Sequence, residues 1–187
     1  MTRRLIIGMS GASGVIYGVR LLEVLAKAGV ETHLVASKSA LITLAHETDL
    51  KWADVKKKAA VVHANDDVTA SIASGSFRTE GMIVAPCSMK SLGEIASGAT
   101  QTLLSRAADV VLKERRRLVL MPRETPLHLG HLRNMTAVTE MGAIVAPPMP
   151  AFYARPKSLE EMVDHGVGRV LDLYGIDAGI VKRWGES

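Results

Sequence analysis

Along most of this chain, short runs of apolar residues alternate with longer segments whose apolar residues recur every three or four positions. Short apolar runs are typical of buried strands, and the longer period is typical of amphipathic helices. The expected strands are residues 5–7, 31–36, 61–63, 81–85, 117–121 and 143–146. The expected helices are residues 15–28, 38–47, 51–58, 89–98, 103–114, 127–141 and 158–174. This alternation predicts a single α/β domain over residues 1–187, with a parallel sheet covered by helices on both faces.

The first expected strand runs into a turn of small residues, Gly11-Ala12-Ser13-Gly14, before the helix that begins at Val15. The first N–H groups of a helix have no partner within the helix, and the helix dipole adds positive charge there. The turn therefore predicts a seat for an anion, most simply a phosphate. The glycine spacing differs from the G-x-G-x-x-G dinucleotide fingerprint. A tight connection that binds no ligand is the alternative interpretation.

Ligands of parallel α/β sheets bind beyond the carboxyl ends of the strands. Five turns are expected to meet there: Gly11 to Ser13, Ser37, Pro86 to Ser91, Arg123-Glu124, and the proline-rich loop 147–150. Pro86 is expected to end its strand. Ser37 and Ser88 stand where helix N-caps are expected, and capping is the alternative to ligand binding for both. Arg123 is suited to bind a phosphate or carboxylate with two hydrogen bonds, and Glu124 to act as a general acid or base. A simple ion pair between these two residues is the alternative.

The composition narrows the class of protein. Hydrophobic residues make up 48% and charged residues 22% of the chain, as in ordinary soluble proteins. The single cysteine, Cys87, leaves no internal disulfide framework and favours a cytoplasmic location. No segment approaches the roughly 18 to 20 apolar residues of a membrane span. The net charge is +4, but the basic residues are scattered and aromatic residues make up 4% of the chain, which argues against nucleic-acid binding.

Several reactive side chains have two interpretations each. Cys87 invites a nucleophile hypothesis, but a thiol needs a base beside it, so a small buried residue is the preferred interpretation. His128 and His131 are three residues apart without an acidic or cysteine partner at metal-ligand spacing, so no metal is expected. Lys113 lies in a basic segment that is typical of a solvated helix end. Tyr153 follows the prolines and is placed either to close over a ligand or to pack within its loop.

Six blocks of sequence, in the same order and over essentially the whole chain, closely resemble the UbiX-like flavin prenyltransferases. The blocks are Gly11-Ala12-Ser13-Gly14, Ala85-Pro86-Cys87-Ser88-Met89-Lys90, Arg106-Ala107-Ala108-Asp109-Val110, Leu112-Lys113-Glu114-Arg115-Arg116, Arg123-Glu124-Thr125-Pro126-Leu127 and Pro150-Ala151-Phe152-Tyr153. The resemblance implies a flavodoxin-like or Rossmann-like fold. It also implies a metal-independent transfer of a dimethylallyl group from dimethylallyl phosphate to N5 and C6 of reduced FMN.

The resemblance implies partners as well. Members of this family commonly form homododecamers, and their prenylated FMN serves a UbiD-type decarboxylase in ubiquinone biosynthesis or aromatic acid decarboxylation. Some relatives carry a tryptophan where this chain has Asp66-Asp67-Val68, so one wall of the isoprenyl pocket is expected to differ. Two other functions remain open: an FMN-dependent cysteine decarboxylase and an FMN carrier without enzymatic activity. The absence of a histidine beside the Gly11–Gly14 turn argues against the decarboxylase.

The residues that the resemblance assigns fall into three groups. FMN is expected to contact Gly11, Ala12, Ser13, Ser37, Ser88, Met89, Lys90, Ser91 and Arg123. The prenyl phosphate is expected to contact Arg106, Lys113, Glu124, Tyr153 and Arg169, with some contacts crossing subunit boundaries. Catalytic roles are expected for Ser13, Glu124 and Lys113.

Overall fold

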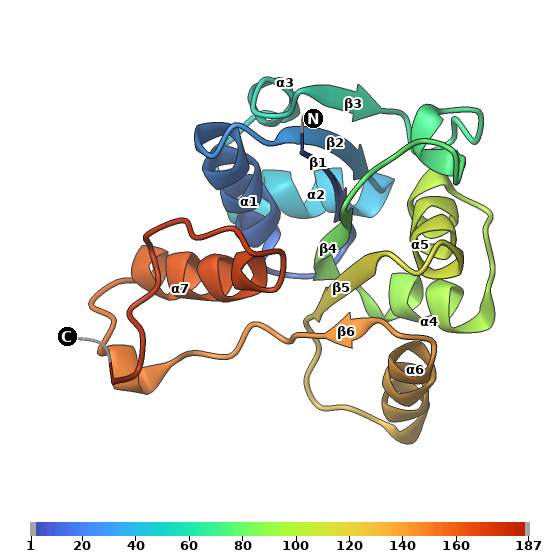
Figure 1. Ribbon diagram of the computed structural model, residues 1–187. Helices are drawn as coiled ribbons and strands as arrows, with labels where there is room; N and C mark the ends of the chain where they lie inside the picture. Colours follow the sequence, from blue (N-terminus) through green and yellow to red (C-terminus); the bar gives the residue numbers. More distant parts are fainter. Residues whose placement is uncertain (1–2, 186–187) are drawn as a thin grey trace.

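The computed structural model describes residues 3–185, and its strands form one six-stranded sheet in which every neighbouring pair is parallel (Figure 1). The strands are β1 (Arg4–Met9), β2 (Glu31–Ala36), β3 (Val61–His63), β4 (Gly81–Cys87), β5 (Arg117–Pro122) and β6 (Ile144–Val145). Their order in the sheet is β3-β2-β1-β4-β5-β6. The α/β fold with a parallel sheet is therefore confirmed.

The connections between the strands are helical. The α-helices are α1 (Val15–Lys27), α2 (Lys38–Glu47), α3 (Trp52–Lys56), α4 (Met89–Ser97), α5 (Leu103–Lys113), α6 (Leu129–Glu140) and α7 (Leu159–Asp172). Two short 3-10 helices complete them, η1 (Ser71–Ala73) and η2 (Phe152–Ala154). Among residues 3–185, none of these helices has both the length and the apolar character that a bilayer crossing requires.

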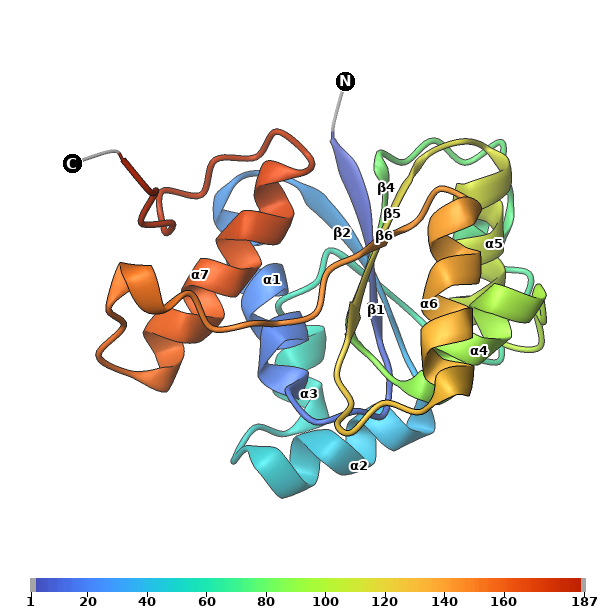
Figure 2. The same ribbon diagram turned by 90° about the horizontal axis from the view of Figure 1, so that it is seen from below.

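Alternate residues of the strands face opposite sides of the sheet and belong to two separate hydrophobic cores. Leu5 and Ile7 of β1 pack on the side of α1 and α7, whereas Ile6 packs on the side of α4 and α5. Figure 2 shows the same division, with α6 beside α4 and α5. Because helices cover both faces, ligands reach the sheet at the edges where its strands begin and end.

At the carboxyl edge of the sheet, the chain leaves two neighbouring strands toward opposite faces. β1 lies between β2 and β4, and the chain continues from β1 to α1 on one face and from β4 to α4 on the other. The connections after β1 and β4 therefore diverge and leave a crevice, which is the usual ligand site of doubly wound sheets. α2 lies beyond this edge (Figure 2).

The expectation that Pro86 ends its strand is wrong. β4 continues through Pro86 to Cys87, and its pairing with β5 is irregular between Val84 and Cys87. Proline has no N–H to donate to the neighbouring strand, so it is tolerated where the ladder is already interrupted. Pro122 similarly closes β5 rather than lying in the following turn.

The remaining differences concern element ends. The helix expected over residues 127–141 begins at Leu129, because His128 caps it: its Nδ1 accepts a hydrogen bond of 3.0 Å from the Gly130 N–H. The expected helix 51–58 is the shorter α3, and the expected strand 143–146 is the two-residue β6.

Candidate active site

The turns after β1, β2, β4 and β5 are joined by hydrogen bonds at the carboxyl edge. The buried Ser10 hydroxyl donates to the Pro86 carbonyl oxygen at 3.0 Å and accepts from the Ser88 N–H at 2.7 Å. The Ser37 N–H donates to the Met9 carbonyl at 2.9 Å. These bonds hold the Gly11–Ser13, Ser37 and Ser88–Ser91 segments together, as the sequence predicted for one edge of the sheet.

Arg123 and Glu124 join this edge from β5. The Arg123 N–H donates to the carbonyl of Cys87 at 3.3 Å, which attaches the turn after β5 to the turn after β4. Both side chains are exposed, and no ion pair joins them within the part of the chain that the structure describes. One Glu124 carboxylate oxygen accepts from the Thr125 N–H at 3.0 Å. Because it is not paired with the neighbouring arginine, the Glu124 carboxylate is available for another partner.

Gly11 allows two of these turns to approach closely. A Cβ atom at this position would lie 2.2 Å from the Cβ of Ser39, at the start of α2. No side chain fits at that distance, so the β1–α1 turn packs directly on the N-terminus of α2. The small residues predicted to let a ligand approach the backbone therefore also have a packing function.

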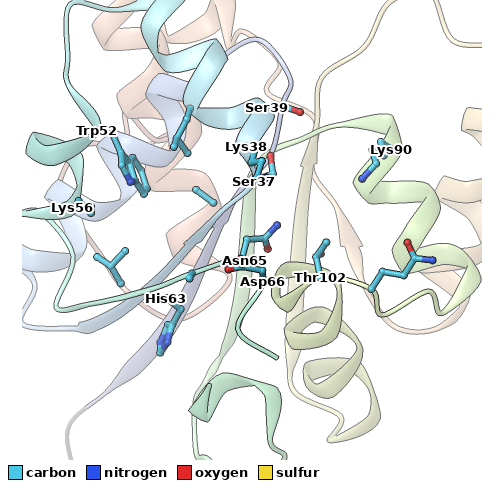
Figure 3. Close-up of a pocket in the computed structure, with 15 residues that line it drawn as sticks. Ser37, Lys38, Ser39, Trp52, Lys56, His63, Asn65, Asp66, Lys90 and Thr102 are labelled. Atoms are coloured by element: carbon cyan, nitrogen blue, oxygen red, sulfur yellow. The ribbon is translucent and has the colours of Figure 1, made fainter. Parts of the chain in front are cut away.

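Three helix N-termini border one cavity of about 590 Å³ (Figure 3). Ser37 caps α2 by accepting from the Ala40 N–H at 3.1 Å, and Thr102 caps α5 by accepting from the Ser105 N–H at 3.3 Å. Lys90, in the first turn of α4, lines the cavity on the remaining side. Helix N-termini favour anions, because their N–H groups and dipoles are positive. The cavity therefore suits a ligand that carries a phosphate.

Other lining residues give the cavity further character. Lys38 and Lys56 add positive charge, and Trp52 adds an aromatic surface (Figure 3). Asn65 supports the wall by accepting hydrogen bonds from the first turn of α5: its side-chain oxygen from the Leu104 N–H at 3.0 Å and its carbonyl from the Leu103 N–H at 2.8 Å. Neither Trp52 nor Asn65 was singled out from the sequence, because their positions carry no recognisable motif.

The β3 side of this cavity is held by a histidine pair. A ring nitrogen of His63, Nε2, lies 2.9 Å from Nδ1 of His33, and the two rings stack with their centroids 5.2 Å apart. The other nitrogen of His33 lies 3.0 Å from a carboxylate oxygen of Glu31. Burial and the neighbouring His33 lower the pKa of His63. The contact between these two histidines thus joins the short edge strand β3 to β2.

The N-terminus of α1 already holds an anion, which corrects the expectation of a phosphate seat formed by its first amides. A carboxylate oxygen of Glu47, the last residue of α2, accepts from the N–H groups of Gly14 and Val15 at 2.9 and 3.1 Å. Partial burial alone would raise the pKa of Glu47, but bonds from the Ser13 hydroxyl and these amides outweigh it and lower the pKa, with help from Arg123. Glu47 is therefore an anionic neighbour of Ser13 that the sequence did not reveal.

Lys113 does not share this edge, whereas Arg106 lies in the first turn of α5, whose capped N-terminus borders the cavity. Lys113 is the last residue of α5 and precedes β5, whereas Glu124 follows β5. A strand of six residues is roughly 20 Å long, so Lys113 and Glu124 lie at opposite ends of the sheet. The Lys113 ammonium pairs with Glu114, and Arg106 pairs with Asp109 at 2.8 Å. One copy of the chain therefore does not bring Lys113 to Glu124.

Tyr153 and Arg169 form a third group, on α7 and the loop before it. The Tyr153 hydroxyl lies 3.1 Å from Nε2 of His165, and Arg169 pairs with Asp172 at 2.7 Å. Arg169 lines a cavity of about 230 Å³ together with Met121 from the end of β5. This group is thus closer to the carboxyl edge than Lys113.

No chemical role is assigned to Cys87, His128 or His131. The Cys87 side chain is buried, and burial raises its pKa to about 12, so the thiol is protonated and unreactive at neutral pH. The His128 and His131 rings pack with centroids 3.6 Å apart. Among residues 3–185 there is no cluster of three or more histidine, cysteine or carboxylate side chains arranged to hold a metal.

Comparison with known proteins gives close matches over the whole chain. The model of a family described as Flavoprotein matches residues 1–185. The flavin prenyltransferase UbiX of Thauera aromatica is 58% identical over 181 residues, covering 97% of this chain and 93% of that protein.

Two solved structures share the fold. The crystal structure of AnUbiX (PadA1) in complex with FMN and dimethylallyl pyrophosphate is 50% identical, covers all of both chains and has a TM-score of 0.98. A dodecameric FMN-dependent UbiX-like decarboxylase from Escherichia coli O157:H7 is also 50% identical, with a TM-score of 0.96 over 98% of this chain and all of that chain.

Proposed function

Since this chain belongs to the UbiX family of flavin prenyltransferases, we propose that its carboxyl-edge cleft binds reduced FMN and that the enzyme transfers a dimethylallyl group from dimethylallyl phosphate to N5 and C6 of that flavin. The observation that carries this assignment is the 58% sequence identity, over 97% of this chain, to a named flavin prenyltransferase. The solved relative with FMN and a dimethylallyl diphosphate has the same fold throughout.

The residues at the cleft fit FMN chemically. The capped N-termini of α2 and α4, together with Lys38 and Lys90, offer hydrogen-bond donors and positive charge for the flavin phosphate. We assign the flavin contacts to residues that lie on the four joined turns: Gly11, Ala12, Ser13, Ser37, Ser88, Met89, Lys90, Ser91 and Arg123.

The donor needs positive charge where its phosphate departs. When the C–O bond of dimethylallyl phosphate breaks, the electron pair stays on the phosphate oxygen, and cations held in place stabilise that charge. Lys113, Arg106 and Arg169 supply cations, and the Tyr153 hydroxyl supplies a hydrogen bond. Reduced FMN supplies the electron-rich N5 and C6 atoms to which the dimethylallyl carbons become attached.

Proton transfer is assigned to groups at the carboxyl edge. Closure of the new ring at C6 releases a proton there and adds one to the prenyl chain, and we assign the transfer of these protons to the exposed Glu124 carboxylate. Ser13 is assigned to the surroundings of N5. Glu47 accepts from the Ser13 hydroxyl, so it orients that hydroxyl and keeps a negative charge beside it.

A complete site requires more than one copy of the chain. Lys113 and Glu124 lie at opposite ends of β5, so both can reach one phosphate only if different subunits supply them. The dodecamer formed by the Escherichia coli relative supports a homododecamer here. We propose that the prenylated flavin passes to a UbiD-type decarboxylase, and that the enzyme works in the cytoplasm, which suits its single buried cysteine.

The direct test is anaerobic incubation of the protein with reduced FMN and dimethylallyl phosphate, followed by mass spectrometry of the extracted flavin. A gain of one five-carbon prenyl unit is expected. The same reaction with dimethylallyl diphosphate tests whether the donor carries one phosphate or two. Unaltered FMN with both donors would contradict the assignment and would leave the carrier and cysteine-decarboxylase functions, which assays with a cysteine-containing peptide would separate.

A further inference from the structure

Tyr153 has a buried partner, His165, that has no role in the mechanism proposed above. His165 is 8% exposed, and its Nε2 lies 3.1 Å from the Tyr153 hydroxyl oxygen. The two rings are nearly perpendicular, at 81°, with centroids 5.6 Å apart. The distance is that of a hydrogen bond, and the perpendicular packing limits how the tyrosine ring can turn.

The two partners differ in how firmly they are held. His165 belongs to α7, whose neighbouring residues Val163 and Val167 are buried in the core shared with α1. Tyr153 lies in η2, a single 3-10 turn of three residues, and is 43% exposed. The histidine is therefore the more firmly held member of the pair, and its hydrogen bond orients the tyrosine hydroxyl, while Trp184 packs against the tyrosine ring with centroids 5.4 Å apart.

The hydrogen-bond chemistry makes this contact directional. A tyrosine hydroxyl has one proton to donate. If His165 Nε2 carries a proton, it donates to the tyrosine oxygen, and the tyrosine proton is free for another acceptor. If Nε2 lacks a proton, the tyrosine donates to the histidine, and its proton cannot serve an anion.

Arg169 indicates what that other acceptor is. It follows His165 by one helical turn, so both side chains lie on the same face of α7, and both line the cavity of about 230 Å³. Tyr153 contacts His165, which lines this cavity with Arg169, and an arginine together with a hydroxyl proton is suited to bind a phosphate.

We propose that His165 is a positioning residue for the prenyl donor: its Nε2–H donates to the Tyr153 hydroxyl and thereby directs the tyrosine proton toward the donor's phosphate. This inference rests on the proposed function, because it takes the prenyl phosphate as the anion at Tyr153 and Arg169. His165 itself acts through the tyrosine and touches neither the flavin nor the reacting carbons.

Two substitutions separate hydrogen bonding from packing. His165→Phe keeps a ring against Tyr153 but removes the hydrogen-bonding N–H group, whereas His165→Gln places an amide N–H at a similar distance. We expect His165→Phe to weaken dimethylallyl phosphate binding about 3- to 10-fold, both as Kd by calorimetry and as KM. The kcat and the affinity for FMN should stay within about 2-fold of wild type, and His165→Gln should recover most of the donor affinity.

A double-mutant cycle tests whether His165 acts through Tyr153. In the Tyr153→Phe background the hydroxyl is gone, so adding His165→Phe should cause no further loss of donor affinity. An equal loss in both backgrounds would overturn the proposal, as would unchanged binding in His165→Phe alone. A merely structural role would instead lower the melting temperature and weaken FMN binding.

Failure of the inference about His165 can be distinguished from failure of the proposed function. If the wild-type protein prenylates FMN but His165→Phe binds the donor normally, this inference alone is wrong. If the wild-type protein neither binds dimethylallyl phosphate nor changes the mass of FMN, the proposed function is wrong, and the role of His165 fails with it.

Discussion

The residues assigned to the flavin and those assigned to the prenyl donor are arranged in different ways. The flavin residues lie on four consecutive strand ends of one sheet, and main-chain and serine hydrogen bonds join their turns within a single chain. The donor residues are distributed over the turn after β5, both ends of α5, η2 and α7. One copy of the chain therefore brings together the residues assigned to the flavin but not all of those assigned to the prenyl donor.

This difference indicates how catalysis can depend on assembly. A monomer is expected to bind FMN, because the residues assigned to it lie on turns that hydrogen bonds join within one chain. The proposed transfer requires Lys113 near Glu124, and the length of β5 prevents that within one chain. Flavin binding and prenyl transfer should therefore respond differently to substitutions in the two groups of residues.

The largest difference between the effect on prenyl transfer and the effect on FMN binding is expected for Glu124→Gln. The amide keeps the size of the side chain but cannot take up a proton, so prenylated FMN should form about 100-fold more slowly or less. The affinity for FMN should change less than about 2-fold, since the backbone of this turn is unaltered. Product formation by rapid-quench mass spectrometry and FMN titration by fluorescence measure the two quantities. A variant with normal product formation would remove Glu124 from the mechanism.

Intersubunit complementation tests whether the donor residues come from different copies. Lys113→Ala and Glu124→Gln should each be inactive alone. Co-expressed with different affinity tags and purified as mixed oligomers, they should regain about a quarter of wild-type activity, because random mixing of a site built from two copies pairs the two intact residues once in four. Mixed oligomers without any recovered activity would indicate that both residues act within one chain. Co-purified wild-type and Glu124→Gln subunits provide the control for mixing.

A smaller effect is expected for Glu47, whose carboxylate accepts hydrogen bonds at the N-terminus of α1. Glu47→Ala leaves the Gly14 and Val15 amides without their acceptor and should lower the free energy of unfolding by about 1 kcal/mol at neutral pH. Because folding lowers the pKa of Glu47, this stabilisation is present above the unfolded pKa and is lost as the pH falls through the folded one. Chemical denaturation of both proteins at pH 7 and pH 3 should show the difference shrinking. A constant difference would mean that the charge contributes nothing.

The smallest effect is expected for Cys87, the buried last residue of β4. Cys87→Ala should leave the transfer rate within about 2-fold of wild type, since the thiol has a pKa of about 12 and is not nucleophilic. The lost sulfur should cost about 1 kcal/mol of stability. Thiol-labelling reagents should fail to modify the folded wild-type protein, and rapid labelling would contradict this account of a buried, inert cysteine.

Much of the fold could be predicted from the sequence because apolar periodicity records it directly. Each of the six expected strands is present, and the serines expected to cap α2 and α4 do so. Element ends were less predictable where a side chain decides them, as at His128, whose imidazole replaces the usual capping residues. The prediction for Pro86 was wrong because the pairing between β4 and β5 is interrupted there, and an interrupted pairing tolerates a proline inside a strand.

The site was predictable only where it follows from strand ends. Glu47 could not be found, because its contact with Gly14 joins residues 33 positions apart and depends on where α2 ends in space. Lys113 and Glu124 are close in sequence, yet an intervening strand holds them at opposite edges. The contact between Tyr153 and His165 likewise depends on how one short loop folds against α7.

The two-sided core also has a consequence for synthesis on the ribosome. The face that carries Leu5 and Ile7 is covered by α1, which is made immediately, and by α7, which is made last of the helices. β1 must in addition wait for β4 before both of its neighbours are present. For most of translation the nascent chain therefore exposes apolar surface and an unpaired central strand, which are the features that chaperones recognise. Folding of this enzyme is expected to finish only after α7 has left the ribosomal exit tunnel.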